Sequence, residues 1–255
     1  MKNTLTAFAG LFVSVAFAAP GLLNCATPQE KMVAAARCGD LNKIKQALKR
    51  GISVNARVGR RGRTALLNAA RIGRWDIVRF LINKGANVNM SSRDSVTAIM
   101  SASGLRAEEL ERYQKRGCNA ALPGVLTPFE RKNIVRERSH RIVRFLVRRG
   151  ADFSIRDRFG NTALHYASRA GNYKTARHLL KKGANINNRN KKRETPLHLA
   201  VRAARLKLVK FLLENGANPK LHDAAGKTPL RIAREKKLFK IIILLEKAAS
   251  REVWT

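Results

Sequence analysis

The sequence predicts an all-α solenoid of about seven helix-turn-helix units joined by hairpin-like loops. The first observation behind this prediction is a recurring phrase in which Thr is followed by Ala or Pro and then by Leu or Ile. It occurs at Thr64, Thr97, Thr162, Thr195 and Thr228. The second observation is the spacing, because the intervals 64 to 97, 162 to 195 and 195 to 228 are all equal, which defines a period of about 33 residues. Self-similarity at such a period indicates units that bury their apolar faces by stacking on their neighbours.

Each unit is expected to contain two helices, as residues 64 to 85 illustrate. Thr64 offers an N-cap oxygen to the first helix, whose small residues allow close packing. Gly73 is expected to end the first helix. The following run from 75 to 84 is too apolar for a solvated helix, so it suits a helix packed on two sides. Gly85 fits the left-handed position that ends the second helix. An extended loop then leads to the next unit.

The interval from Thr97 to Thr162 is almost twice this period, and we interpret it as two units rather than one unit with an insertion. Lys115-Arg116-Gly117-Cys118-Asn119 occupies a closing position, and Thr127-Pro128-Phe129 supplies an opening. Glu130-Arg131-Lys132 departs from the pattern, so we expect a kink or a looser stack near 120–138. The repeat domain is predicted to span 25–255, with units at approximately 28–60, 61–93, 94–123, 124–157, 158–190, 191–223 and 224–255.

Three phrases in these units resemble the ankyrin repeat. They are Thr195-Pro196-Leu197-His198-Leu199-Ala200, Thr162-Ala163-Leu164-His165-Tyr166-Ala167 and Gly183-Ala184-Asn185-Ile186-Asn187. The resemblance covers about residues 28–255. It implies loops that form hairpin fingers, first helices that line a concave face, and a groove in which protein partners dock. It also implies that His165 and His198, which share one slot of the repeat, have a structural hydrogen-bonding role.

Residues 1–24 have the composition of an export signal or an N-terminal anchor. Lys2 precedes an uncharged apolar stretch, and small residues around Ala18 resemble a cleavage site. Cys25 and the residues before it resemble the lipobox of bacterial lipoproteins, although Asn24 departs from the usual small residue. Three alternatives stay open: a cleaved periplasmic or secreted protein, a protein anchored by a lipid on Cys25, and an uncleaved segment long enough to cross a bilayer.

The three cysteines are not expected to form a disulfide framework. Cys38 and Cys118 fall in the first and third predicted units, too far apart to bridge within one molecule, so we expect them to act as small buried hydrophobic residues. Catalytic, cofactor and metal sites are not expected either. Gly226-Lys227-Thr228 resembles the end of a phosphate-binding loop, but Leu221 stands where such a loop needs glycine. We therefore predict a protein that is not an enzyme and has no cofactor.

Positive charge is the second strong feature of the sequence. It has 52 Lys and Arg residues but only 17 Asp and Glu residues, which gives a net charge of +35. The cations recur at equivalent positions, so stacking is expected to align them in rows. One row lies in the second helices: Lys45, Arg79, Glu111, Arg144, Arg177, Lys210 and Ile243. A second row precedes the closing glycines: Lys49-Arg50, Lys84, Lys115-Arg116, Arg148-Arg149 and Lys181-Lys182. For the apolar Ile243, we expect cover either from the tail through Trp254 or from a partner.

Cations in the last turn of a helix complement its dipole, but an excess of this size repels itself, which favours binding to an acidic partner. Biased codon usage and a simple solubility device are the alternatives. The candidate partner-binding residues crowd the predicted fingers and the ends of the first helices. They are Arg57, Arg60, Arg61, Arg63, Arg71, Arg74, Arg156, Arg158, Arg169, Lys191, Lys192, Arg193, Arg202 and Arg205.

The expected partner is an acidic protein docked in the groove or an anionic envelope surface. Nucleic acid is not expected, because aromatic residues make up only 6% of the chain and sit mostly in apolar positions. We predict an exported, monomeric binding scaffold. The alternatives are a structural or chaperone-like envelope protein and a secreted effector that acts on a host protein.

Overall fold

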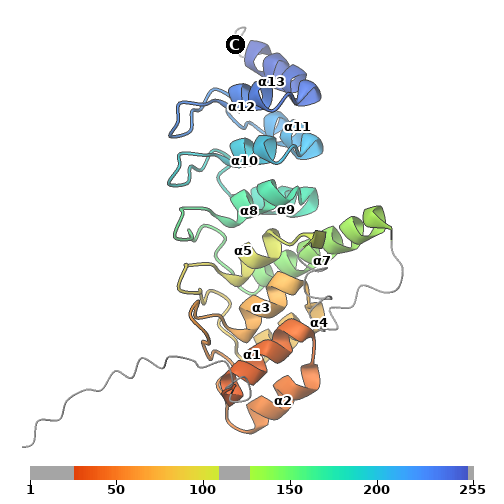
Figure 1. Cartoon of the computed structure of the whole chain (residues 1–255), viewed down its shortest axis with the longest axis vertical. Coiled ribbons are helices and arrows are strands. Elements are labelled where there is room, and N and C mark those ends of the chain that lie inside the picture. The colour runs from red at the N-terminus through yellow and green to blue at the C-terminus, as the bar shows by residue number, and fades with distance from the viewer. Residues whose placement is uncertain (1–25, 109–126, 252–255) are drawn as a thin grey trace, which may run out of the picture.

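The computed structural model describes residues 26–108 and 127–251, which form helices joined by loops (Figure 1). The helices are α1 (Pro28–Cys38), α2 (Leu41–Lys49), α3 (Ala65–Ile72), α4 (Trp75–Asn83), α5 (Ala98–Ser103), α7 (Pro128–Arg148), α8 (Ala163–Ala170), α9 (Tyr173–Lys181), α10 (Pro196–Arg202), α11 (Leu206–Glu214), α12 (Pro229–Glu235) and α13 (Phe239–Arg251). An inner row contains α1, α3, α5, α8, α10 and α12, and an outer row contains the other helices. The predicted all-α solenoid is confirmed.

The local signals of the repeat account for the ends of these helices. The Thr64 hydroxyl accepts a hydrogen bond from the Leu67 amide at 3.2 Å, and Thr228 caps α12 in the same way. Gly85 follows α4 with a φ of 81°, in the left-handed region that glycine enters without steric cost. The next amide, that of Ala86, then reaches back to the Leu81 carbonyl at 2.9 Å. The ends of the helices are thus capped by residues of the same unit.

The core is continuous along the whole array. One cluster of buried side chains extends from Met32 in α1 to Leu245 in α13. Alanines such as Ala69 and Ala102 on the inner helices are fully buried, which lets consecutive helices approach closely. Because each pair buries its apolar face only against its neighbours, the stability of one layer depends on the adjacent layers.

The segment between α5 and α8 differs from the prediction. α7 is one helix of 21 residues, whereas two helices were expected in 124–157. The inner helix α5 packs on both α3 and α8, and α7 packs between α4 and α9 in the outer row. α5 and α7 therefore form one pair, and the described residues stack as six pairs rather than seven. Among the described residues, the helices expected in separate units at 94–123 and 124–157 therefore lie in one layer.

The fingers are the loops that join one helix pair to the next, at 50–64, 84–97, 149–162, 182–195 and 215–228. Hydrogen bonds between successive fingers also show that α5 and α7 belong to one layer. The Arg158 amide donates to the Asp94 carbonyl at 2.9 Å. The Asn89 side chain accepts from the Asp152 amide at 2.8 Å and donates to the Gly150 carbonyl at 3.1 Å. The finger after α4 thus lies directly beside the finger after α7. The extra residues are inserted between α5 and α7, and the ladder of fingers continues without a break.

A capping box explains why α7 begins early. The Thr127 hydroxyl accepts from the Glu130 amide at 3.2 Å, while the Glu130 carboxylate accepts from the Thr127 amide at 2.8 Å. Glu130 and Lys132 are exposed, and Phe129 is 72% exposed, so this stretch lacks the buried face that a first helix of a unit would need. The Thr127 opening is real, but it starts an extended second helix. The closing motif expected at 115–119 and Glu111 lie outside the described residues.

Two contacts hold the ends of the inserted segment. A small second core contains Ile72, Leu105, Ala107 and Val135. The buried Asn172 side chain donates to the carbonyls of Ser103 and Leu105 at 2.7 and 3.2 Å. Asn172 precedes α9, so the next layer fixes the end of α5.

The cysteine prediction needs correction. Cys38 is disulfide-bonded and half-buried rather than an unpaired core residue. The other two cysteines, Cys25 and Cys118, lie outside the described residues, as does the signal or anchor expected in 1–24. Across 26–108 and 127–251, no helix combines the length and the apolar character that crossing a membrane requires.

Candidate functional site

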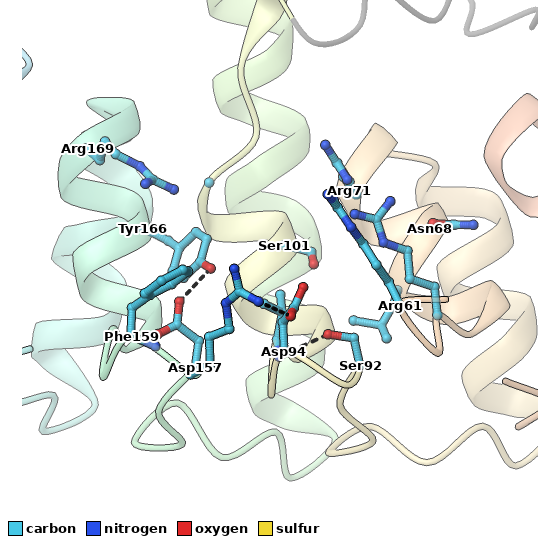
Figure 2. Close-up of a pocket in the computed structure, with 15 residues that line it drawn as sticks. Arg61, Asn68, Arg71, Ser92, Asp94, Ser101, Asp157, Phe159, Tyr166 and Arg169 are labelled. Carbon is cyan, nitrogen blue, oxygen red and sulfur yellow. Dashed lines mark hydrogen bonds and ion pairs between the residues drawn. The ribbon is translucent and has the colours of Figure 1, made fainter. Parts of the chain in front are cut away.

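A hollow of about 300 Å³ opens on the finger face, the side of the array formed by the fingers and the inner helices (Figure 2). Its floor lies over α3, α5 and α8, and the tips of three successive fingers form its rim. Asp94 belongs to the middle finger and has Arg61 on one side of it (Figure 2). On the other side, Arg158 of the next finger pairs with Asp94. The third helix pair therefore lies at the centre of this hollow.

The hollow exists because the third pair has small side chains where its neighbours have large ones. The residues four and seven positions after the opening Thr face this side. In α3 they are Asn68 and Arg71, and in α8 they are Tyr166 and Arg169. In the layer between them they are Ser101 of α5 and Gly104, which directly follows α5. A Cβ atom on Gly104 would lie 2.9 Å from Cδ1 of Tyr166, so the Tyr166 ring leans over the space that the glycine leaves.

Asp157 organises one wall of the hollow. Its Oδ1 atom accepts hydrogen bonds from the amides of Phe159 and Asn161, both at 2.8 Å. Its Oδ2 atom accepts from the Tyr166 hydroxyl at 2.9 Å. Burial, and then the negative charge of Asp157, raise the pKa of Tyr166, which keeps the phenol neutral and donating. The buried carboxylate is thus occupied by its own finger and by α8.

Arginines dominate the charge of this site. Arg61, Arg63, Arg71, Arg158 and Arg169 line it together with two acidic residues, Asp94 and Asp157, so the lining carries a net charge of 5 − 2 = +3. Arg158 pairs with Asp94 at 2.9 Å, and its guanidinium lies 4.5 Å from the centre of the Phe159 ring. The Arg169 guanidinium lies 5.1 Å from the centre of the Tyr166 ring. Guanidinium groups stay charged at physiological pH and bind carboxylates with paired hydrogen bonds.

The structure gathers five of the fourteen predicted partner-binding residues here: Arg61, Arg63, Arg71, Arg158 and Arg169. Five more are exposed on fingers outside the lining of this hollow. They are Arg57, Arg60, Lys191, Lys192 and Arg193.

The remaining four predicted residues make contacts within the array. Arg202 forms ion pairs with Glu194 at 3.0 Å and with Asp223 at 2.9 Å. Arg156 bonds to Asn188 and Arg189 of the next finger. The Arg205 side chain packs over Gly171 and donates to the Arg169 carbonyl at 3.4 Å.

Arg74 departs furthest from the prediction. It donates to the Cys38 carbonyl at 3.1 Å, and it lines a different hollow, between α4 and α7, with Trp75 and Arg141. The expected convergence of the predicted cations on one face therefore holds for only part of the set.

Sequence reasoning missed several residues of the site: Ser101, Gly104, Asp94, Asp157 and Phe159. The small residues carried a readable signal, because they break the size pattern at the fourth and seventh positions of the repeat. The acidic residues gave no such signal, since a lone Asp in a loop commonly stabilises the loop itself.

His165 and His198 have the structural role that the resemblance implied. His165 Nδ1 accepts from the Thr162 amide at 3.2 Å, and Nε2 lies 3.2 Å from the Glu194 carbonyl. His198 makes the equivalent contacts to Thr195 and Lys227. Burial lowers the pKa of His165 to about 4 and also lowers the pKa of His198. Both rings are therefore neutral bridges between layers.

The outer row carries the predicted ladder of cations. Lys45, Arg79, Arg144, Arg177 and Lys210 occupy equivalent exposed positions in five consecutive layers. Ile243 takes this position in α13 and is 64% exposed, while Trp254 lies outside the described residues. Several cations on this face lie over aromatic rings, as Arg141 does over Trp75 at 4.3 Å. In the described ranges, no group of three or more His, Cys, Asp or Glu residues is arranged to hold a metal ion.

The stacked helix pairs and the hydrogen-bonded fingers define a helical-repeat solenoid. A family model described as ankyrin repeats (three copies) matches residues 31–113, 133–223 and 187–252. The chain belongs to the ankyrin repeat family. Members of this family generally mediate protein–protein interactions and are typically non-catalytic scaffolds.

One relative shows the same similarity over a shorter stretch. The chain is 37% identical over 71 residues to the ankyrin repeat, SAM and basic leucine zipper domain-containing protein 1 of Mus musculus. This stretch is 28% of the chain and 14% of the mouse protein. The chain therefore covers only a small part of that protein's length.

Proposed function

We propose that this protein is a non-catalytic scaffold that binds an acidic segment of a partner protein in the finger-face hollow. One observation carries the proposal: a recess left by Ser101 and Gly104 is surrounded by five arginines and only two aspartates. The two acidic groups already have partners, because Asp94 pairs with Arg158 and Asp157 is held by its own finger. The site therefore presents an excess of cationic donors to an incoming carboxylate.

The rim also fits a peptide rather than an isolated ion. Phe159 is 52% exposed and lies on the rim, where it offers an apolar contact beside the arginines. Lys191 and Lys192 extend the positive surface along the next finger. An extended segment that alternates carboxylate and apolar side chains would match both features.

The experiment measures binding of a fluorescein-labelled hexaglutamate peptide by fluorescence anisotropy. Reversing two charges in Arg71→Glu/Arg169→Glu is expected to weaken binding by about tenfold or more, from roughly 1 kcal/mol for each pair. The matched control, Arg79→Glu/Lys210→Glu, changes the net charge equally on the outer row and should lose less than about twofold.

Salt supplies a second readout. Binding should weaken steeply between about 50 and 300 mM NaCl, because exposed charges are screened over this range. Equal losses in both double variants, or an affinity that does not respond to salt, would show that the hollow is not the binding site.

A second candidate function is electrostatic attachment to an anionic envelope surface. The aligned cations from Lys45 to Lys210 favour it, since basic residues near such a surface each contribute about 1 kcal/mol. In this case Arg79→Glu/Lys210→Glu would lose binding to anionic vesicles, and Arg71→Glu/Arg169→Glu would keep it.

We also propose that the chain is exported, with residues 1–24 as its signal or anchor. The disulfide of Cys38 supports this, because structural disulfides persist mainly in oxidising compartments. Mass spectrometry of the mature N-terminus distinguishes the alternatives. Acylated Cys25 places the protein on a membrane and free Ala19 places it in solution outside the cytoplasm. An intact Met1 in the cytoplasmic fraction would refute export.

A further inference from the structure

Two histidines and four cations meet on the outer row, on the opposite side of the array from the fingers. His140 on α7 and His178 on α9 face each other with ring centres 5.8 Å apart and planes at 83°. They line a surface hollow of about 370 Å³ with Arg144, Lys174, Arg177 and Lys181. α7 and α9 pack directly on each other, so the backbone of two layers holds this cluster together (Figure 1).

The histidines replace side chains that serve a different purpose in other layers. At the first position of the outer helix, α4 and α9 have Trp75 and Tyr173, whose rings lie beneath Arg141 and Lys207. At the sixth position α4 has Phe80, whose ring lies beneath Lys45. Between α7 and α9 these positions hold imidazoles, which can take up a proton near neutral pH. The cation ladder thus acquires titratable rings at the junction of α7 and α9.

Each imidazole has a nitrogen whose hydrogen-bonding capacity is unused. His140 Nδ1 and His178 Nε2 are buried and have no hydrogen-bond partner among the described residues. A buried polar atom without a hydrogen-bond partner is costly. A ligand that forms a hydrogen bond with this nitrogen would remove that cost, and its binding would be stabilised. The acidic group next to the cluster, Glu137, is already paired with Lys174.

We propose that this cluster binds a doubly charged tetrahedral oxyanion of the phosphate or sulfate class. Arg144 and Arg177 are placed to neutralise its charge, and a protonated imidazole would donate to its oxygens. This site is separate from the finger-face hollow. It would give the outer row a binding site for one defined anion. It can take either a free anion or the phosphomonoester headgroup of a lipid such as phosphatidic acid, since both present a doubly charged tetrahedral group.

The surroundings of the histidines make this binding depend on pH. The charged groups around them on α7 and α9 are Glu137, Arg138, Arg141, Arg144, Arg148, Lys174, Arg177 and Lys181, with Lys182 just beyond α9. On α4, Arg74 and Asp76 line the neighbouring hollow that includes His140. Burial is the main cause that lowers the pKa of both histidines. Glu137 opposes this shift at His140, and the nearby cations add to it at both rings, so both are neutral near pH 7. A bound dianion favours the protonated rings, so affinity should rise as the pH falls.

The first experiment uses sodium sulfate, whose charge does not change between pH 5 and 8. Titrations are followed by the NMR signals of the histidine ring protons. Arg144→Gln/Arg177→Gln should weaken sulfate binding by about tenfold or more, since two charge-assisted contacts are lost. The control Arg79→Gln/Lys210→Gln removes the same charge from the same row and should change the affinity by less than about twofold.

The second experiment tests the histidines. Wild-type affinity for sulfate should rise about threefold to tenfold from pH 7.5 to 5.5, as an imidazole takes up a proton. His140→Gln/His178→Gln should remove this rise and leave the thermal midpoint near the wild-type value. Equal losses in the cluster and control variants, or histidine signals that do not move with sulfate, would overturn the proposal.

A third arm identifies the source of the oxyanion. Co-sedimentation with vesicles of phosphatidylcholine containing phosphatidic acid is compared with binding of inorganic phosphate in solution. Vesicle binding that fails in Arg144→Gln/Arg177→Gln supports a lipid phosphate. Binding of inorganic phosphate with no cluster-dependent vesicle binding supports a free anion. Failure of both would refute the site, and it would leave the finger-face proposal untouched.

Discussion

Acid should destabilise this protein through His165. The ring is fully buried, and both of its nitrogens are used: Nδ1 accepts from the Thr162 amide and Nε2 contacts the Glu194 carbonyl. If Nδ1 took up a proton, its N–H would point at the Thr162 N–H, so two donors would face each other. The protonated ring would also place a positive charge in the core. His165→Gln removes the titrating group, so a comparison of the two proteins isolates its effect.

The magnitude follows from the two pKa values. Burial lowers the pKa of His165 from the ordinary 6.5 to about 4 in the folded chain. The unfolded chain therefore binds more protons between these values, so the free energy of unfolding falls as the pH falls. The loss attributable to this one group is about 2 kcal/mol at pH 5 and about 3 kcal/mol at pH 4. Above pH 6.5 the contribution is complete.

Urea unfolding at pH 7, 6 and 5 tests this directly. Wild-type protein should lose about 2 kcal/mol more than His165→Gln between pH 7 and 5, since only the wild type carries the buried ring. His222→Gln, in which an exposed histidine is replaced, is the control and should behave like the wild type. If His165→Gln and the wild type lose the same free energy over this range, the assignment of a buried neutral bridge is wrong.

Three further predictions follow from individual contacts. Asn172→Ala leaves the carbonyls of Ser103 and Leu105 without their donor and should lower the free energy of urea unfolding by about 2 kcal/mol, whereas the exposed Asn42→Ala should change it by less than about 0.5 kcal/mol. Gly104→Ala places a Cβ atom 2.9 Å from the Tyr166 ring and should cost about 1 kcal/mol; an unchanged thermal midpoint would show that the ring moves freely. Reduction with dithiothreitol should lower the thermal midpoint, and peptide mapping without reduction should recover a Cys38-linked peptide; a free Cys38 thiol would contradict the disulfide.

The fold class was predictable because its signals are local. Thr64 caps its own helix, Gly85 closes its own unit, and the apolar residues between them define two helix faces within one period. Such interactions depend on neighbours a few positions away, so they repeat with the sequence. The structural role of His165 was accessible for the same reason, since its contact with Thr162 lies within the opening phrase.

The number of layers was not predictable in this way. The interval between Thr97 and Thr162 is almost two periods, so a degenerate unit and an insertion give the same spacing. The choice depends on whether α5 packs on α8, a contact between segments that lie almost two periods apart in the chain. Thr127 could not decide it, because its capping box starts a helix in either arrangement.

By itself, the sequence determined the repeat, the boundaries of most helices and the abundance of positive charge. Only the tertiary structure decided how that charge is used. Arg71 and Arg169 line a hollow because the layer between them has Ser101 and Gly104, whereas Arg202 is bound to acidic residues of the fingers beside it. A side chain's role in a solenoid depends on the size and charge of its neighbours in adjacent layers, and those neighbours come from other repeats.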